Sequence, residues 1–127
     1  MDKKIIKPAG APVPVGPYNQ AVVIGNLVYT SGQIPIDPKT NQIVGATIGE
    51  QTQMVITNLK AVLEGAGTSL YKAVKATVFL KNMNDFAGMN EVYAQFFNAQ
   101  TAPARSTIEV ARLPKDALVE IEVVACL

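Results

Sequence analysis

Arg105 and Glu120 are the two side chains whose types and settings point most directly to chemistry. Arg105 lies directly before an alternating run at residues 106–111, and Glu120 lies within a second alternating run at residues 118–126. A guanidinium group holds a carboxylate through two parallel hydrogen bonds. A glutamate can position a water molecule or move a proton. Together they could bind the carboxylate of a small acid and position or deprotonate a water molecule.

Each candidate residue also has a plain structural interpretation. Arg105 can pair with a carboxylate at a strand end, and Glu120 can form a surface or inter-subunit ion pair. Tyr18 follows Gly-Pro in a rigid turn, where it either packs at the sheet edge or lends its hydroxyl to a ligand. The Ser-Gly-Gln run at residues 31–33 ends a strand, where glycine permits close approach of a ligand to the backbone. The pattern alone leaves these alternatives open.

The residues that are absent narrow the chemistry further. The chain contains no histidine and a single cysteine. Ser-His-Asp and Cys-His catalysis and the usual zinc sites are therefore excluded, and we expect neither a metal nor a cofactor. Cys126 is expected to be a small core residue, because no histidine can activate it. The glycines of residues 65–67 follow a helix, so they do not form a phosphate-binding loop.

Length and composition indicate one globular domain over residues 1–127. The chain is 49% hydrophobic and 17% charged, with a net charge of +1. This charge gives no general attraction for nucleic acid, which is not expected as a partner. No apolar stretch is long enough to span a membrane. One cysteine suits a reducing compartment, so we expect a cytoplasmic protein.

Short β-prone runs alternate with two helical patterns along the chain. Gly25 and Asn26 predict a two-residue type II′ hairpin turn. The expected strands are residues 20–24, 27–31, 73–81, 106–111 and 118–126, with a short extended piece at residues 34–36. In the run at residues 73–81, Val74 is expected to share one face with Ala76, Val78 and Leu80.

The two helices are expected to cover a single face of the sheet. Thr47 and Glu50 form a capping box before an apolar stripe that ends near residue 66. Asn84 is expected to cap the second helix, whose apolar side carries Phe86, Met89, Tyr93, Phe96 and Phe97. These elements predict an α+β fold. The last strand also carries apolar residues on its second face, which predicts that self-association covers that face.

Four blocks of this sequence resemble the reactive-intermediate deaminase (Rid or YjgF) family, and the RidA subgroup in particular. They are Gly16-Pro17-Tyr18-Asn19-Gln20-Ala21, Thr30 to Pro35, Asn84 to Phe97, and Pro103-Ala104-Arg105-Ser106 through Glu122. The blocks occur in the family's order and span nearly the whole chain. Position 107 is often cysteine in the family and is threonine here, and the loop between Phe97 and Pro103 is short.

This resemblance implies a fold and an assembly. The subunit would be chorismate-mutase-like, with a mixed sheet and two helices on one face. Three subunits would form a homotrimer with their sheets facing inward and three clefts between subunits.

The resemblance also implies an activity and the residues that carry it. The activity is that of a 2-iminobutanoate/2-iminopropanoate deaminase, which hydrolyses reactive imines and enamines from pyridoxal-phosphate enzymes to 2-oxo acids and ammonia. Arg105 would bind the substrate carboxylate, and Glu120 would hold the attacking water. Tyr18 would complete the catalytic set, and the remaining binding residues would be Ser31, Gly32, Asn90 and Thr107.

A second class of function is open at this point. The protein could bind small carboxylates without catalysis, or act as a regulatory protein of the translation-inhibitor or chaperone-like kind. A carboxylate binder needs only Arg105, so the presence of Glu120 as well favours catalysis.

Overall fold

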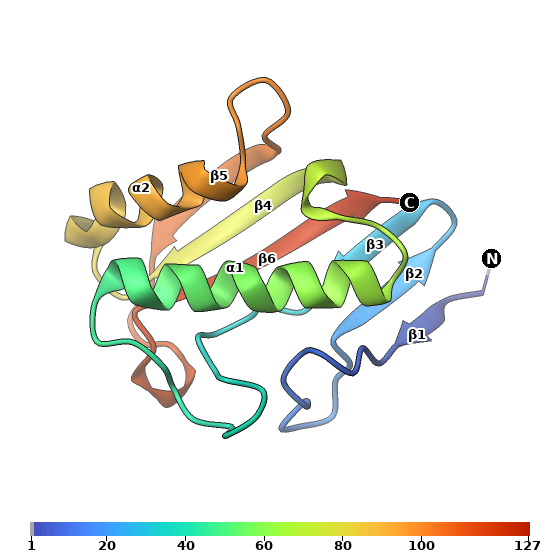
Figure 1. Ribbon diagram of the computed structural model, residues 1–127, viewed down its shortest axis with the longest axis horizontal. Coiled ribbons are helices and arrows are strands. Elements are labelled where there is room, and N and C mark those ends of the chain that lie inside the picture. Colours follow the sequence, from blue (N-terminus) through green and yellow to red (C-terminus); the bar gives the residue numbers. More distant parts are fainter. Residues whose placement is uncertain (1) are drawn as a thin grey trace.

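Residues 2–127, as described by the computed structural model, form one six-stranded sheet and two α-helices (Figure 1). The strands are β1 (Lys4–Ile6), β2 (Ala21–Ile24), β3 (Leu27–Thr30), β4 (Ala73–Leu80), β5 (Ala104–Glu109) and β6 (Val119–Cys126). The helices are α1 (Ile48–Gly65) and α2 (Phe86–Phe96).

The strands lie in the order β1-β2-β3-β6-β4-β5, which makes β1 and β5 the edges. Only the β4–β5 pair is parallel, because α2 carries the chain back across the sheet between these two strands. Both helices lie on the same face, α1 in front of the middle strands and α2 beside β4 and β5 (Figure 1). The predicted α+β fold, a mixed sheet with two helices on one face, is confirmed.

The first strand was not predicted. The run Lys4–Ile6 is too short to show a period, yet it pairs with β2 and buries Ile6. The piece predicted at residues 34–36 is not a strand, because only Gln33 and Ile36 make isolated bridges around it. In both cases pairing across the sheet decides the outcome, and local sequence carries little information about it.

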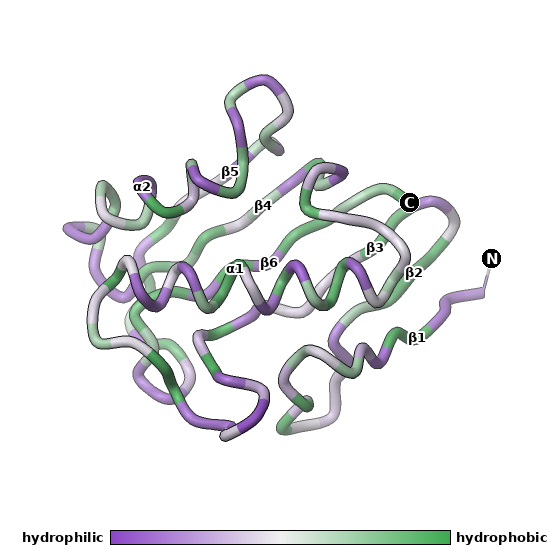
Figure 2. The backbone as a smooth tube through the Cα atoms, viewed as in Figure 1, coloured by the Kyte–Doolittle hydropathy of each residue, from purple (hydrophilic) through white to green (hydrophobic). Residues whose placement is uncertain are grey.

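The start of α1 follows the prediction, but the start of α2 does not. Thr47 and Glu50 form the reciprocal capping box. Hydrophilic and hydrophobic segments follow one another along α1 about once per helical turn (Figure 2). Asn84 does not cap α2. It lies within the short 3-10 helix Met83–Asp85, where its N–H donates to the side chain of Asn82.

Two details of the sheet correct the sequence analysis. A register shift between Ala73 and Lys75 places Ala73 in the core, so that Val74 is exposed and not on the buried face. Cys126 is half-buried on the sheet face opposite the helices, and the neighbouring core position belongs to Ala125. The predicted alternation of β6 is otherwise confirmed.

The face opposite the helices carries apolar side chains that nothing in residues 2–127 covers. Five of them, from four different strands, are 36–46% exposed: Ile5, Ile24, Leu27, Tyr29 and Ile108. Their pairing register puts them on the side of Glu120 and Val124, away from α1 and α2. Such a surface is typical of an interface.

Gly25 makes the hairpin between β2 and β3, with the positive φ of 57° that the predicted turn requires. Within residues 2–127 no helix is both long and apolar enough to cross a bilayer.

Candidate active site

The seven residues predicted for the site lie in two separate regions. Tyr18, Ser31, Gly32 and Glu120 line one cavity, which we call the Glu120 pocket. Arg105 and Thr107 lie on β5 beside α2, which carries Asn90. We call the second region, formed by Arg105, Thr107, Phe86, Asn90 and Tyr93, the Arg105 cluster.

The pairing of the strands explains this separation. Arg105 pairs with Ala76 of β4, and Glu120 pairs with Phe79 of the same strand. Side chains of paired residues project to the same side, and positions three apart on one strand project to opposite sides. Arg105 therefore faces the helices, whereas Glu120 faces the open side. The two side chains cannot converge on one small molecule within a single chain.

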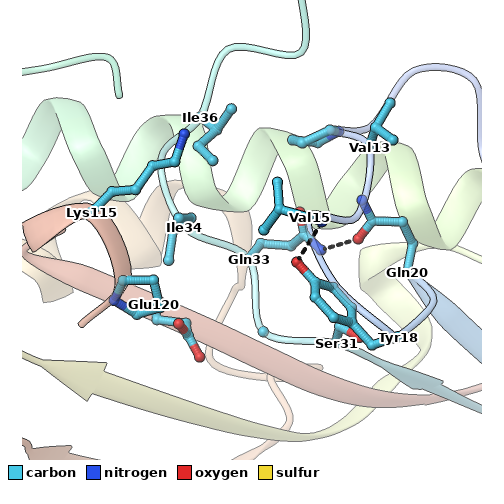
Figure 3. Close-up of a pocket in the computed structure, with 13 residues that line it drawn as sticks. Val13, Val15, Tyr18, Gln20, Ser31, Gln33, Ile34, Ile36, Lys115 and Glu120 are labelled. Atoms are coloured by element: carbon cyan, nitrogen blue, oxygen red, sulfur yellow. Dashed lines mark hydrogen bonds between the residues drawn. The ribbon is translucent and has the colours of Figure 1, made fainter. Parts of the chain in front are cut away.

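The Glu120 pocket is a cavity of about 400 Å³ between β6, the segment after β3 and the N-terminal segment (Figure 3). Most of its wall is apolar, formed by Pro12, Val13, Val15, Ile34, Ile36 and Pro114. Its polar side chains include Glu120, the Tyr18 hydroxyl and Lys115. An apolar wall with a few placed polar groups is the usual form of a small-molecule site.

Hydrogen bonds tie the walls of the pocket together. The Ser31 N–H donates to the Gln20 carbonyl at 2.8 Å, and the Gln33 side-chain amide donates to the Gln20 side chain at 2.8 Å. Gln33 also exchanges two backbone hydrogen bonds with Ile121, next to Glu120. Gln20 and Gln33 are almost completely buried. Their pairing fixes Tyr18, Ser31 and Glu120 relative to one another.

The Glu120 carboxyl group lies directly against Gly32. A Cβ atom added to Gly32 would be 2.8 Å from Cδ of Glu120, so that any side chain at position 32 would displace the carboxylate. Burial, with a smaller contribution from the like charge of Glu122, raises the pKa of Glu120. A carboxylate of raised basicity is suited to accept a proton.

Tyr18 contributes a hydroxyl group to the same pocket. Its oxygen accepts a hydrogen bond from the Val15 N–H at 3.3 Å, which leaves the hydroxyl proton free to donate (Figure 3). The ring is 46% exposed at the pocket mouth. Of the two interpretations of Tyr18, the structure is compatible with a hydroxyl that lines a pocket; its role toward a ligand stays a prediction.

In the Arg105 cluster, the guanidinium lies over two aromatic rings. Its central carbon is 4.7 Å from the ring centre of Tyr93 and 5.6 Å from that of Phe86. Asn90 lies on the same stripe of α2, four residues after Phe86 and three before Tyr93, and is half-buried. Among residues 2–127, Arg105 has no carboxylate within ion-pair distance. The structural interpretation, an ion pair within the chain, is therefore wrong.

The same cluster holds two buried hydroxyl groups without a hydrogen-bond partner in the described residues, those of Tyr93 and Thr107. Burial raises the pKa of Tyr93, and the nearby Arg105 guanidinium partly opposes this. A cation with no counter-ion beside free hydroxyl groups is an arrangement that an anionic ligand would complete.

Sequence reasoning missed several of these contributors. The sequence predicts Tyr93 and Phe86 only as part of the apolar side of α2, because an aromatic stripe is typical of a helix face that packs in the core. For Gln20 and Gln33 a signal was present in the sequence. Two glutamines next to short strands need hydrogen-bond partners when they are buried, and each could have been proposed as the partner of the other. Lys115 lies in the turn that the sequence predicts between the last two strands, but its positive φ of 55° was not indicated by any pattern.

In the described part of the chain, no three His, Cys, Asp or Glu side chains lie together as metal ligands would.

Comparison with known proteins places the chain in a family. The family model described as Endoribonuclease L-PSP matches residues 9–127. A RutC family protein of Pyrococcus horikoshii is 55% identical over 97% of both chains. The 2-iminobutanoate/2-iminopropanoate deaminase of Escherichia coli is 48% identical over 96% of both chains. The crystal structure of Escherichia coli TdcF with bound serine is 47% identical, with 98% of both chains covered and a TM-score of 0.91. These matches confirm the resemblance seen in the four sequence blocks: the chain belongs to the Endoribonuclease L-PSP family, which is the YjgF/Rid family.

Proposed function

We propose that this protein hydrolyses 2-imino acids to 2-oxo acids and ammonia, in clefts that join the Arg105 cluster of one subunit to the Glu120 pocket of the next. The observation that carries this proposal is the placement of Arg105 and Glu120 on opposite faces of one sheet. A second copy of the chain is the simplest way to bring both groups to one ligand. The uncovered apolar sheet face supports the same assembly, for which we propose a trimer.

The roles follow from the surroundings of each group. The unpaired Arg105 guanidinium binds the substrate carboxylate, assisted by Asn90 and Thr107. Glu120 holds a water molecule against Gly32, while the Tyr18 hydroxyl and Ser31 orient the substrate. The apolar wall of the pocket takes the substrate side chain.

The reaction needs only water and proton transfers. As the water oxygen bonds to C2 of the imine, Glu120 accepts a water proton and the C=N electron pair moves to nitrogen. That proton passes to the nitrogen, which gives a carbinolamine. Glu120 then moves the hydroxyl proton of the carbinolamine to the nitrogen, the C–N bond breaks as the C=O bond forms, and the 2-oxo acid and ammonia leave. The raised pKa of Glu120 suits it to accept and return that proton. Placement of water and imine together can lower the barrier by several kcal/mol, on the order of 7 or more in favourable cases.

Relatives support the chemistry in part. One is named 2-iminobutanoate/2-iminopropanoate deaminase, whereas another carries only the RutC family name. The family model's description mentions an endoribonuclease, but a net charge of +1 and a chain without histidine do not favour RNA cleavage.

A coupled assay tests the proposal directly. Threonine dehydratase, or an amino-acid oxidase, generates the imine, and its decay is followed with and without this protein. We expect faster decay with the protein present. An unchanged rate with a folded, oligomeric protein would leave the carboxylate-binding function as the alternative.

A further inference from the structure

Three buried hydroxyl groups have no hydrogen-bond partner within residues 2–127, and two of them belong to the Arg105 cluster. They are the hydroxyls of Thr52, Tyr93 and Thr107. A buried hydroxyl without a partner is destabilising, so its retention calls for a reason. Tyr93 is only 6% exposed. Its free hydroxyl lies on the residue whose ring contacts the Arg105 guanidinium.

The guanidinium has more donors than a ligand carboxylate can use. Arginine has five N–H donors, and a carboxylate bound through both oxygens accepts two of them. The remaining N–H donors of the guanidinium need other acceptors once a bound ligand shields the guanidinium from water. Among the described residues Arg105 has no carboxylate partner. The Tyr93 hydroxyl can serve as an acceptor, because the ring that carries it has its centre 4.7 Å from the central carbon of the guanidinium. In the structure this hydroxyl makes no hydrogen bond to the described residues, so it is available to one of these N–H groups.

The Tyr93 ring is itself held in place. Phe97 packs on it with ring centres 4.5 Å apart, and both side chains are buried. The ring is therefore a rigid surface beside the guanidinium, with Phe86 as a second contact at 5.6 Å. A flat cation against a fixed ring loses much of its freedom to rotate.

We infer that Tyr93 is the positioning residue of Arg105: its ring fixes the guanidinium plane, and its hydroxyl accepts the N–H groups that face away from the bound ligand carboxylate. Tyr93 acts only through Arg105 and need not touch the ligand. The inference rests on the proposed function, because it assumes that Arg105 binds a carboxylate. It assigns a role in binding to a residue that sequence pattern placed in the core.

The test is a double-mutant cycle with a matched control. Binding of 2-oxobutanoate is measured by calorimetry for the wild type, Tyr93→Phe, Arg105→Lys and the double variant. Thr52→Val is the control, since it also removes a buried hydroxyl without a partner, on α1 and outside the cluster. Thermal unfolding of each variant is recorded. In the ligand-free protein, the NMR signal of the Arg105 Nε–H reports the ring contact, and Tyr93→Leu removes that ring.

We expect Tyr93→Phe to weaken 2-oxobutanoate binding roughly tenfold without lowering the melting temperature. The same change in the Arg105→Lys background should have almost no further effect, because its action depends on the guanidinium. Thr52→Val should bind like the wild type. The Arg105 signal should move in Tyr93→Leu and stay in place in Thr52→Val.

Equal binding by Tyr93→Phe and the wild type, or an equal loss in both backgrounds, would overturn the inference. Failure of the proposed function is a separate result: 2-oxobutanoate is bound normally but the imine is not hydrolysed. If the wild type binds no 2-oxobutanoate, the proposed function is wrong. The NMR experiment then decides alone, and an unchanged Arg105 signal in Tyr93→Leu rejects the positioning role.

Discussion

The Glu120 pocket and the Arg105 cluster differ in how their polar groups are satisfied. In the pocket, Gln20, Ser31 and Gln33 are joined by hydrogen bonds that connect three segments of the chain. In the cluster, a guanidinium without a counter-ion lies beside two free hydroxyl groups. The side chains of Gln20 and Gln33 are thus paired within the chain, whereas the hydroxyl groups of Tyr93 and Thr107 have no partner in the described residues.

This difference indicates a division of roles. A rigid pocket would meet the need of the proposed hydrolysis, in which a water molecule and Glu120 are placed accurately before reaction. The cluster holds its cation with aromatic rings, which set its orientation without neutralising its charge. A charge that is oriented but not neutralised is available to a ligand. The comparison predicts that damage to the cluster affects binding and damage to the pocket affects turnover.

The largest expected effect comes from mixing two inactive variants. Arg105→Ala and Glu120→Gln should each lose roughly 100-fold or more in activity. If every cleft takes Arg105 from one subunit and Glu120 from the next, an equal mixture regains activity in about one quarter of all its clefts, because each mixed trimer has one competent cleft in three. The measurement is imine hydrolysis after the two variants are refolded together.

As the control, each variant is unfolded and refolded alone in the same way, and its imine hydrolysis is measured. No recovery in the mixed sample, with mixed assemblies demonstrated by distinct tags, would mean that each cleft draws both residues from one chain. A stable monomer at micromolar concentration by light scattering would remove the shared cleft altogether.

Much of the fold that positions these regions could be predicted from local sequence. The capping box of Thr47 and Glu50 and the alternation of β6 are determined by neighbouring residues, and both are confirmed. Strand β1 and the register shift at Val74 depend on pairing with distant strands. A three-residue run or one extra residue gives no periodic signal of its own, so both were missed.

Prediction of the site was limited in the same way, because part of it depends on pairing between distant strands. Residue types and family blocks identified the predicted site residues. They did not show that Arg105 and Glu120 face opposite sides, because that follows from the pairing of both with β4. They also did not distinguish Tyr93 from an ordinary core aromatic, since the role proposed for it depends on the guanidinium that β5 brings against it.

A second pair of variants sharpens the contrast between binding and turnover. Arg105→Lys keeps the charge but loses the two-bond fork, so kcat/KM should fall roughly 10- to 100-fold, with weaker 2-oxo acid binding. Glu120→Gln should lower kcat while 2-oxo acid binding stays near normal. Its melting temperature should equal or exceed that of the wild type, because burial disfavours the charged form of Glu120. Calorimetry and steady-state kinetics separate the two patterns.

A smaller effect is expected from Gly32→Ala, which perturbs the pocket through one contact. The added methyl group meets the end of the Glu120 side chain, which can move aside, so the fold should survive. The displaced carboxylate should lower kcat roughly tenfold. Gly10→Ala is the matched control, because its added methyl group makes only an ordinary 3.7 Å contact with Ala61. Equal kcat for the two variants would show that the position of the Glu120 carboxylate does not matter.

The smallest expected effect is a shift in the pH profile on removal of the Glu122 charge. Glu120 must be ionised to accept a proton, so activity is lost as the pH falls through its pKa. That pKa is raised above its usual 4.5, mainly by burial and further by Glu122. Glu122→Gln removes the like charge, lowers the pKa of Glu120 and moves the acidic limb of kcat to lower pH. Burial remains, so the limb should still lie above that of an ordinary glutamate.

The measurement is kcat against pH for wild type and Glu122→Gln in one buffer system, with the source of imine kept in excess. Added salt provides the control, because it screens the repulsion between the Glu120 and Glu122 carboxylates. In the wild type, salt should therefore move the acidic limb to lower pH, as the mutation does. In Glu122→Gln, salt should move the limb less. A limb that stays fixed under both changes would assign the titration to a group other than Glu120. The role of proton acceptor would then have to move from the Glu120 pocket to another part of the cleft.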